Sequence, residues 1–529
     1  MSATLTEPRS RASASSQGGL FTTPDGRSHV LTFALITSLF FLWALCNGMI
    51  DVMDKHFQDY LHLSKAQSAW VQFAHYLGYF LMATPAGWLA SRLGYKGGII
   101  TGLLIVAVGC LWFIPATQIS TFWAFLLGVC VISMGLTCLE TIANPYTTVL
   151  GAPAQGAVRI NIAQSFNGIG WVCGPIVGGM FFYSSEGAEA AHQRLWIPYA
   201  AVAGAVAVLV LIFWKAKMPD LSGQDLDAEG APHSDLKPKA ERRATRFLAA
   251  ANSCVLGLSV GMIVMAVIKI FLPDSSLPFI GLAVSAVIVA LLVARHLFGR
   301  LRDTFEHVWT HPHFSGATVA QFFYVAAQAG IFAFFINYIV AEPPSIPEAW
   351  RDSWLLGGAS GSIEKNGVWH VTEQGATKLL AYLGFTLFLA GRFSGSFILR
   401  RVAAHRILGL YAALNVVMMT LIVLKLGWIS VAALFLSFFF MSVMFPTIFA
   451  LGIFGLGKNS KKASSFIVMA IMGGAILPKL MGMLGDHYGM SIAFAMPLVC
   501  FAIVATYGFS WSRLSGAEGL VGCKPAGGH

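Results

Sequence analysis

The chain contains about fourteen apolar stretches of roughly 20 residues, each long enough to cross a lipid bilayer as one helix. Because a bilayer core offers no hydrogen-bond partners, a spanning segment must satisfy its own backbone, so these stretches predict helices. They fall near residues 30–50, 68–90, 97–116, 122–143, 160–184, 194–214, 248–272, 277–297, 314–341, 377–399, 406–425, 429–455, 462–485 and 490–511. Only 11% of the residues are charged, against ~25% in soluble proteins, so we predict an all-α membrane protein.

The apolar stretches are grouped as six, then two, then six, with a polar linker after the first group. The expected division is a tail at 1–29, a six-helix bundle at 30–214, a linker at 215–247, an inserted helix pair at 248–297, a loop at 298–313, a second six-helix bundle at 314–511 and a tail at 512–529. Two six-helix halves around one central site are typical of alternating-access carriers.

The basic residues indicate how the chain is oriented in the membrane. Fourteen spans place both termini on the same side, and roughly 24 of the 34 Lys and Arg residues lie in loops on that side, against about 7 on the other. We therefore expect a multi-pass protein of the cell (inner) membrane with both termini in the cytoplasm. The net charge of +10 then reflects topology, so no nucleic-acid partner is predicted.

Motifs for metal binding or catalysis are missing from the sequence. The eight cysteines are scattered without CxxC spacing, and the dense histidine pair His311-Pro312-His313 has no carboxylate or thiol at ligand spacing. No GxSxG, HExxH or P-loop pattern is present, so neither a hydrolase nor an ATP-driven pump is predicted. We expect no metal, no cofactor and no enzymatic activity.

Two carboxylates stand out against the apolar background. Glu140 lies inside the apolar stretch 131–145, where an ionised side chain costs at least ~2.5 to 3.5 kcal/mol and usually faces a polar cavity. Asp51 directly follows the first apolar stretch, which places it at the end of a helix. Because burial favours the neutral form of a carboxyl group, such residues can take up a proton on one side and release it on the other.

The segment between the second and third stretches, Gly87 to Lys96, resembles the G-x-L-x-D-R-x-G-R-K loop of the major facilitator superfamily. Ser91 stands where that family has Asp, and Tyr95 where it has Arg. We therefore expect the loop to lack the charge latch that holds the inward gate in this family, with Arg92 and Lys96 kept as cytoplasmic anchors.

Further motifs in both halves resemble the L-fucose:proton symporter branch of this superfamily. The motifs are Leu39–Ala44 with Asp51, Cys138–Pro145, Asn161–Asn167, Gly391–Gly395, Phe445–Phe449 and Ser464–Met469. The resemblance spans about four fifths of the chain and leaves out the tails, the linker and the inserted pair. The resemblance implies import of a monosaccharide together with a proton, L-fucose or a related hexose or deoxyhexose. It also implies that Asp51 and Glu140 line the central cavity and couple transport to protons.

A sugar needs donors and acceptors for its hydroxyls and a flat apolar surface for its ring. The candidate binding residues of the spans are Trp43, Asn47, Gln72, Asn144, Gln164 and Asn167 in the first half, and Gln321, Tyr324, Gln328, Asn337 and Arg392 in the second. Gln321, Tyr324 and Gln328 share one helix face. Each amide could instead join two helices, and Trp43 could serve packing alone. His75 could join the proton path or fill a hydrogen-bonded packing position.

The sequence leaves two rival functions open. The segment Gly170 to Gly179 resembles the G-x-x-x-G-P-x-x-G-G pattern of drug:proton antiporters, although its glycines also suit close helix packing. A sugar sensor on the same fold is the other rival, but the tails are short for a signalling domain. We expect a monomer in the lipid bilayer, with protons and a monosaccharide as partners and with the inserted pair at the periphery.

Overall fold

The structure is a computed structural model. It describes residues 19–22, 26–61, 70–152, 155–182, 193–219, 238–271, 277–298, 306–309, 311–342, 344–351, 353, 356–357, 361–365, 367–456 and 459–516.

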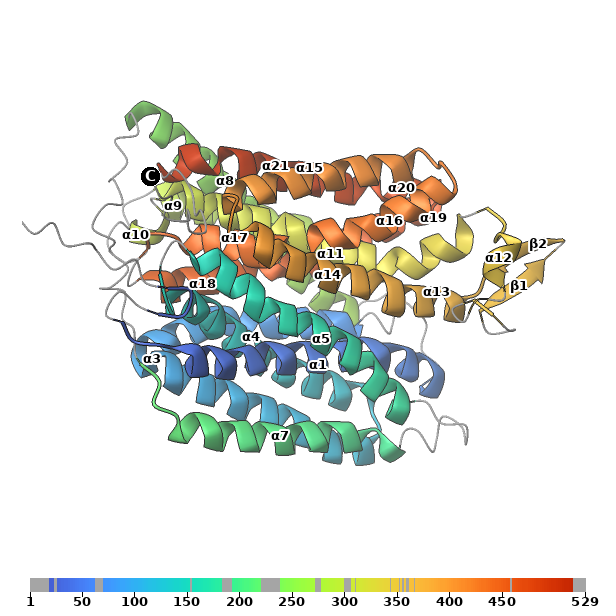
Figure 1. Ribbon diagram of the computed structural model, residues 1–529, viewed down its shortest axis with the longest axis horizontal. Coiled ribbons are helices and arrows are strands. Elements are labelled where there is room, and N and C mark those ends of the chain that lie inside the picture. Colours follow the sequence, from blue (N-terminus) through green and yellow to red (C-terminus); the bar gives the residue numbers. More distant parts are fainter. Residues whose placement is uncertain are drawn as a thin grey trace, which may run out of the picture.

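The first half of the molecule is built from apolar helices that run back and forth (Figure 1). Its helices are α1 (Val30–Tyr60), α3 (Trp70–Ile119), α4 (Phe122–Val149), α5 (Gly156–Phe182) and α7 (Trp196–Lys215). α3 contains two passes, because its backbone leaves the helical conformation at Gly94 (φ 72°, ψ −179°). Glycine suits that turn, since a positive φ is strained for residues with a Cβ atom.

The second half follows an inserted pair, α8 (Pro238–Phe271) and α9 (Leu277–Phe298), and the short helix α10 (Glu306–Trp309). Two of its passes are single helices, α11 (Pro312–Ala341) and α15 (Ala404–Val423). The other passes consist of consecutive helical pieces: α13 (Glu373–Leu379), a π-helical turn at Leu380–Gly384 and α14 (Phe385–Ile398); α16 (Trp428–Met441) and α17 (Met444–Ile453); α18 (Ser460–Met469), a 3₁₀ turn at Ala470–Met472 and α19 (Gly473–Tyr488); and α20 (Met490–Ala493) and α21 (Ala495–Ser515).

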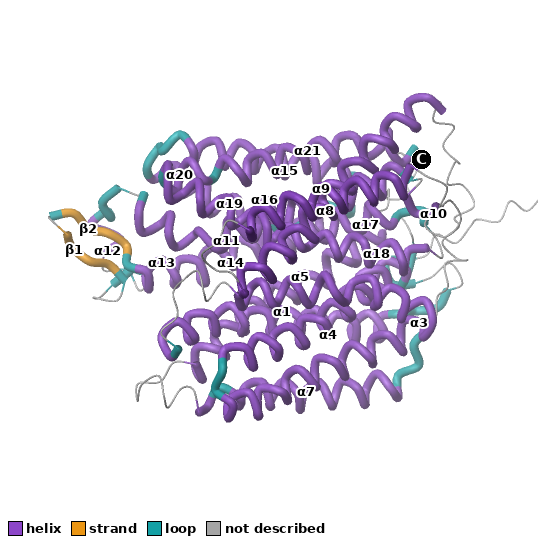
Figure 2. The backbone as a smooth tube through the Cα atoms, turned by 180° about the vertical axis from the view of Figure 1, so that it is seen from behind, coloured by secondary structure: helices purple, strands orange, loops and turns teal. Residues whose placement is uncertain are grey.

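The two halves lie side by side with their helices roughly parallel to one long direction (Figures 1 and 2). Within the described residues, ten helical segments are long and apolar enough to cross a membrane, some of them made of two consecutive helices, and α3 is one of the ten although it makes two passes. Each half has its own large buried apolar core. The chain is therefore a multi-pass, all-α membrane protein, as the apolar stretches predicted.

Three helix boundaries differ from the sequence prediction. α1 continues to Tyr60, so Asp51 lies inside a helix and not at its end. α8 begins at Pro238, ten residues before the predicted 248, and the segment 87–96 is helical apart from the kink at Gly94. All three differences have the same cause. Hydropathy marks where a helix enters the hydrocarbon of the membrane, whereas the helix itself continues through polar residues as long as its backbone is hydrogen-bonded.

Lys96, two residues after the kink at Gly94, forms hydrogen bonds to the end of α7. Its ammonium group donates hydrogen bonds of 2.7 and 2.8 Å to the carbonyl oxygens of Trp214 and Ala216, where α7 ends. A cation at a helix C-terminus satisfies carbonyls that have no partner within the helix. Ser91 bonds instead to the carbonyl of Gly87 within its own helix, and Arg92 lies over the ring of Trp88.

Glycines of α5 let that helix approach α1 closely. A Cβ atom at Gly170 would lie 2.5 Å from the carbonyl oxygen of Phe41, and one at Gly174 would lie 2.7 Å from that of Leu45. These distances are too short for any larger residue, so the glycines that resemble the antiporter pattern serve helix packing here.

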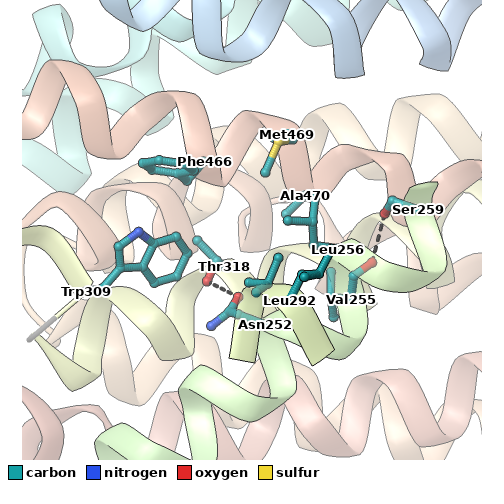
Figure 3. Close-up of a pocket in the computed structure, with 11 residues that line it drawn as sticks. Asn252, Val255, Leu256, Ser259, Leu292, Trp309, Thr318, Phe466, Met469 and Ala470 are labelled. Atoms are coloured by element: carbon teal, nitrogen blue, oxygen red, sulfur yellow. Dashed lines mark hydrogen bonds between the residues drawn. The ribbon is translucent and has the colours of Figure 1, made fainter. Parts of the chain in front are cut away.

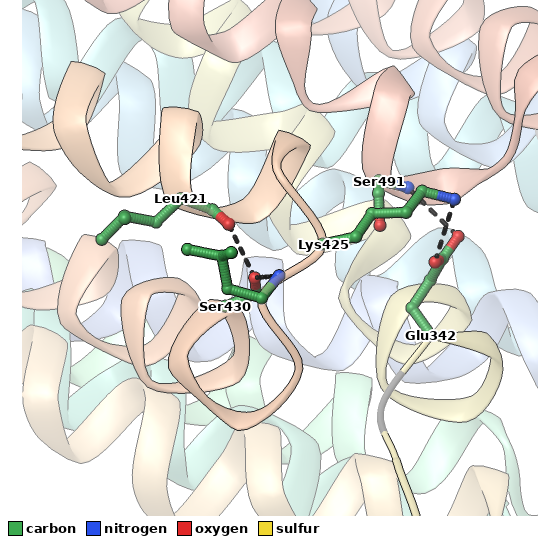
Figure 4. A network of polar contacts seen from close by, with 6 residues as sticks. Glu342, Leu421, Lys425, Ser430 and Ser491 are labelled. Atoms are coloured by element: carbon green, nitrogen blue, oxygen red, sulfur yellow. Dashed lines mark hydrogen bonds and ion pairs between the residues drawn. The ribbon is translucent and has the colours of Figure 1, made fainter.

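At the end opposite the C-terminus, a short hairpin extends from the second half (Figure 1). Its strands, β1 (Ser362–Lys365) and β2 (Val368–Val371), are antiparallel, and the small helix α12 (Glu348–Arg351) lies beside them. At the same end of the molecule, Glu342 pairs with Lys425 at 3.5 Å and accepts a hydrogen bond from the backbone of Ser491 (Figure 4). This contact lies where the ends of α11, α15 and α20 meet.

The inserted pair packs as a hairpin against the second half. A Cβ atom at Gly261 of α8 would lie 2.7 Å from the carbonyl oxygen of Leu282 in α9, so the two helices are in close contact. α8 also contacts α11 and α19, whereas α9 contacts mainly α8. α9 therefore lies at the periphery of the described structure, where its exposed apolar residues face outward.

Candidate functional site

Polar side chains of the first half meet those of the second along the middle of the molecule. Hydrogen bonds among the described residues join the halves, from α4 and α5 on one side to α14, α17 and α18 on the other. They link Arg392 to Asn167 and to Gln164, Asn161 to Thr447, and Ser464 to the carbonyl oxygen of Thr141. Between membrane helices, such bonds favour one arrangement of the two halves over others.

Arg392 is the centre of this interface. Its Nη1 donates to Asn167 Oδ1 at 2.8 Å and also to the backbone carbonyl and the side-chain oxygen of Gln164, while its Nε donates to the carbonyl of Ser442 at 3.1 Å. The guanidinium also lies 4.7 Å from the centroid of the Phe388 ring. Only 4% of Arg392 is exposed, so a full positive charge is buried where the halves meet.

Glu140 lies close enough to Arg392 for an electrostatic interaction between the two side chains. It is 4% exposed, and Tyr79, Arg392 and Trp43 are the side chains that interact with its carboxyl group. The Oε2 atom of Glu140, the hydroxyl of Tyr79 and the indole Nε1 of Trp43 are all buried, yet each lacks a partner within normal hydrogen-bond geometry. A carboxylate and two donors thus lie close together with part of their hydrogen-bonding capacity unused, which is the arrangement expected where a proton or a polar ligand completes the contacts.

Two buried amides, Asn144 and Gln321, also have polar atoms without hydrogen-bond partners. Gln164 donates to Asn144 Oδ1 at 3.1 Å, which leaves the Asn144 amide nitrogen without a partner. Neither polar atom of Gln321 has a partner, although the residue is fully buried. Unmet buried polar groups cost roughly 1–3 kcal/mol each, so a ligand rich in hydroxyls would be stabilised by completing them.

The other predicted binding residues occupy several environments. Asn47 bonds to the backbone of Trp43 at 2.8 Å and interacts with Tyr79, and Tyr324 donates to the carbonyl of Met441 at 2.9 Å. Gln72 and Gln328 are partly buried, and Asn337 is exposed, so it does not join the buried cluster.

Two further residues, His75 and Asp51, were predicted to titrate. His75 is buried and lies 2.7 Å from the hydroxyl of Ser133, with the rings of Tyr76 and Tyr79 beside it. Asp51 lies in α1, but its side chain is outside the described part of the structure.

Sequence reasoning missed three aromatic residues of the site. Tyr79 faces Glu140, and Trp171 lies edge-on to Trp43 at 6.1 Å and stacks on Phe385 of the other half at 6.1 Å. Helical spacing carried a signal for two of them, since Tyr79 follows His75, and Trp171 follows Asn167, by four residues. Phe385 lies beside the π-helical turn and had no comparable signal.

Metal ligands do not gather in the site. Within the described ranges, no three His, Cys, Asp or Glu side chains lie together as a metal site would require.

Two halves of membrane-spanning helices that meet around a buried carboxylate, an arginine and several amides define a secondary carrier. The comparisons with known proteins place the chain more closely. A sequence model of the Major Facilitator Superfamily matches residues 31–347. The chain therefore belongs to the major facilitator superfamily.

Individual relatives are similar over nearly the whole length. The L-fucose-proton symporter of Escherichia coli (strain K12) is 31% identical over 494 residues, which cover 91% of this chain and 93% of that protein. A glucose/galactose transporter of Brucella abortus is 28% identical over 500 residues, which cover 93% and 96% of the two chains. The crystal structure of the transporter FucP in the outward conformation has a TM-score of 0.64 at 30% identity, with 92% of this chain and all of that one covered.

Proposed function

We propose that the protein is a proton-coupled monosaccharide importer, for L-fucose or a related hexose, that works by alternating access of its two halves. The observation that carries the proposal is the environment of Glu140. A carboxylate without a full set of partners lies between two buried donors and a buried arginine of the other half. Relatives that cover more than nine tenths of the chain are named as sugar transporters and L-fucose-proton symporters.

In this proposal, Glu140 and Asp51 carry the coupling proton. When Glu140 is charged, it attracts Arg392 across the interface, and protonation weakens that attraction. The rearrangement of the halves is thereby linked to proton uptake. Asp51 is assigned the same role from its place in the family motif.

The sugar is proposed to bind beside this pair. Asn144, Gln164, Asn167, Gln321 and Arg392 supply hydrogen bonds, and Trp43 with Trp171 supplies a flat apolar surface. Unmet amides favour a hydroxylated substrate over a lipophilic cation, since an apolar drug would leave them without partners. This is the reason to prefer the sugar importer over the drug antiporter.

The bonds between the halves support a proposal for the direction of opening. Ser464 and Asn161 lie near the ends of their helices that face the side of the chain termini, and both bond to the opposite half. We place both termini in the cytoplasm and the protein, as a monomer, in the cell membrane. The described arrangement is then closed on the cytoplasmic side.

Proteoliposomes test the function directly. Uptake of a panel of radiolabelled monosaccharides, with and without an inward proton gradient, should identify at least one sugar whose accumulation needs the gradient. In energised cells, adding that sugar should make an unbuffered medium more alkaline. If no sugar does so and overexpression instead protects cells from lipophilic cations, the protein is a drug:proton antiporter.

A further inference from the structure

A cavity of about 400 Å³ lies between the inserted pair and the second half, away from the site described above (Figure 3). α8 and α9 form one wall through Val255, Leu256 and Leu292. Phe466 and Met469 of α18 form the opposite wall. The cavity is therefore shaped jointly by the inserted helices and by a helix that touches the first half.

Three polar side chains that line this cavity, those of Asn252, Thr318 and Ser259, are already hydrogen-bonded within the protein. Asn252 donates 2.9 Å bonds to the carbonyls of Leu248 and Ser315, and its Oδ1 accepts a 2.6 Å bond from Thr318. Ser259 donates at 2.9 Å to the carbonyl of Val255 in its own helix. A water molecule needs two to four polar partners and a sugar needs more, so neither is stabilised here.

The mouth of the cavity opens on the outer surface of the inserted pair. Leu292 lines the cavity and is still 59% exposed, and it continues a run of exposed apolar residues on α9 that includes Val287 and Leu291. In a membrane protein, this surface is in contact with lipid hydrocarbon. Lipid acyl chains therefore surround the mouth of the cavity. An apolar lining also favours binding of an apolar chain.

The cavity lies near one membrane surface. Asn252 is six residues into the apolar stretch of α8 that begins at Arg246, and Trp309 comes from the short helix α10 outside the long spans. Tryptophan is enriched at the level of lipid headgroups. A lipid whose headgroup remains at this surface can therefore extend one tail between the helices.

We propose that this cavity binds an acyl chain of a membrane phospholipid. The bound chain fills the space between the inserted pair and α18, in contact with Phe466 and Met469. Two residues before Phe466, Ser464 bonds to Thr141 of the first half at 2.8 Å. The lipid thus contacts the helix that joins the halves, and the inserted pair serves as the outer wall of a lipid site.

Photolabelling of the full-length protein tests the proposal without reference to transport, so its failure is distinct from failure of the proposed function. The protein is reconstituted in phosphatidylcholine–phosphatidylglycerol vesicles in which a small fraction of the phosphatidylcholine carries a diazirine in one tail. After irradiation, adducts are mapped by mass spectrometry. We expect severalfold more adducts on the peptides of α8 and α18 that line the cavity than on Val208–Trp214 of α7, whose exposed residues face outward.

Matched variants distinguish the cavity from the general lipid surface. Leu256→Trp fills the cavity and should reduce labelling of Phe466 and Met469 severalfold. Leu258→Trp, two residues away, 42% exposed and outside the lining, should not change it. If Leu256→Trp does not assemble, Leu292→Trp blocks the mouth and takes its place. Unchanged labelling of α18 in the folded filling variant, or adducts no denser than on α7, would overturn the proposal.

Discussion

Arg392 of α14 donates a 2.8 Å hydrogen bond from Nη1 to the side-chain oxygen of Asn167 in α5, across the boundary between the two halves. Both residues are almost fully buried, at 4% and 2% exposure. A charge-assisted bond of this kind is roughly twice as strong as a neutral one, so it stabilises the arrangement in which the halves meet at this point. Alternating access requires that the bond break or be exchanged for contacts with the substrate.

Replacing Glu140 with Gln removes the titrating group and keeps its size. We expect Glu140→Gln to abolish sugar accumulation driven by a proton gradient, while counterflow exchange of the sugar persists. The control is Glu342→Gln, because Glu342 pairs with Lys425 at the molecular end, where that lysine is half exposed, and a pair of this kind contributes little. Both variants are measured in proteoliposomes, and normal accumulation by Glu140→Gln would exclude the proposed role.

Removing the Asn167 amide should weaken sugar binding. Asn167→Ala deletes a hydrogen-bonding group of the proposed site and one acceptor of Arg392, so we expect a loss of about 1–3 kcal/mol in binding free energy. Isothermal titration with the transported sugar measures it. Asn252→Ala is the matched control, since it removes a similarly buried amide in α8 and should leave affinity unchanged even if stability falls. Equal affinities in both variants would remove Asn167 from the site.

The hydroxyl of Tyr79 is expected to serve coupling more than binding. Tyr79→Phe keeps the ring but deletes the donor that faces Glu140, so the pH dependence of uptake should shift while sugar affinity changes little. Tyr146→Phe deletes a hydroxyl that bonds to the carbonyl of Pro219 at 2.7 Å and should leave the pH profile as it is. A profile for Tyr79→Phe that matches the unmodified protein argues against a role in proton transfer.

Close contact between α1 and α5 should make Gly174 intolerant of larger residues. In Gly174→Val, the new side chain meets the backbone of Leu45 and Gly48, and overpacking of this kind costs about 1–3 kcal/mol. Gly204→Val on α7 meets no atom within 4 Å and should be nearly neutral. Thermal unfolding in detergent, followed by loss of the monodisperse peak, compares the two. Equal midpoints would mean that α5 can move away from α1 without cost.

The sequence predicted the features that depend on the lipid solvent. Long apolar stretches must be helical in a bilayer, and Glu140 must face a polar interior, because hydrocarbon satisfies neither backbone nor charge. The fold class, the repeated six-helix arrangement and the burial of Glu140 could therefore be expected from the order of residues, and the motifs indicated the superfamily that the comparisons then confirmed.

Only the tertiary structure decided which residues of the candidate site meet. Tyr79, Trp171 and Phe385 belong to three different helices, and their approach to Glu140, Trp43 and each other depends on helix rotation and crossing, which hydropathy does not encode. Asn337 carries the same amide as Asn144 but lies on an exposed face. The cavity between the inserted pair and the second half likewise depends on packing, because residues of α8, α9, α11 and α18 line it together. Local chemistry thus determines that a segment is a membrane helix, and packing between helices determines which face of that helix contributes residues to the candidate site.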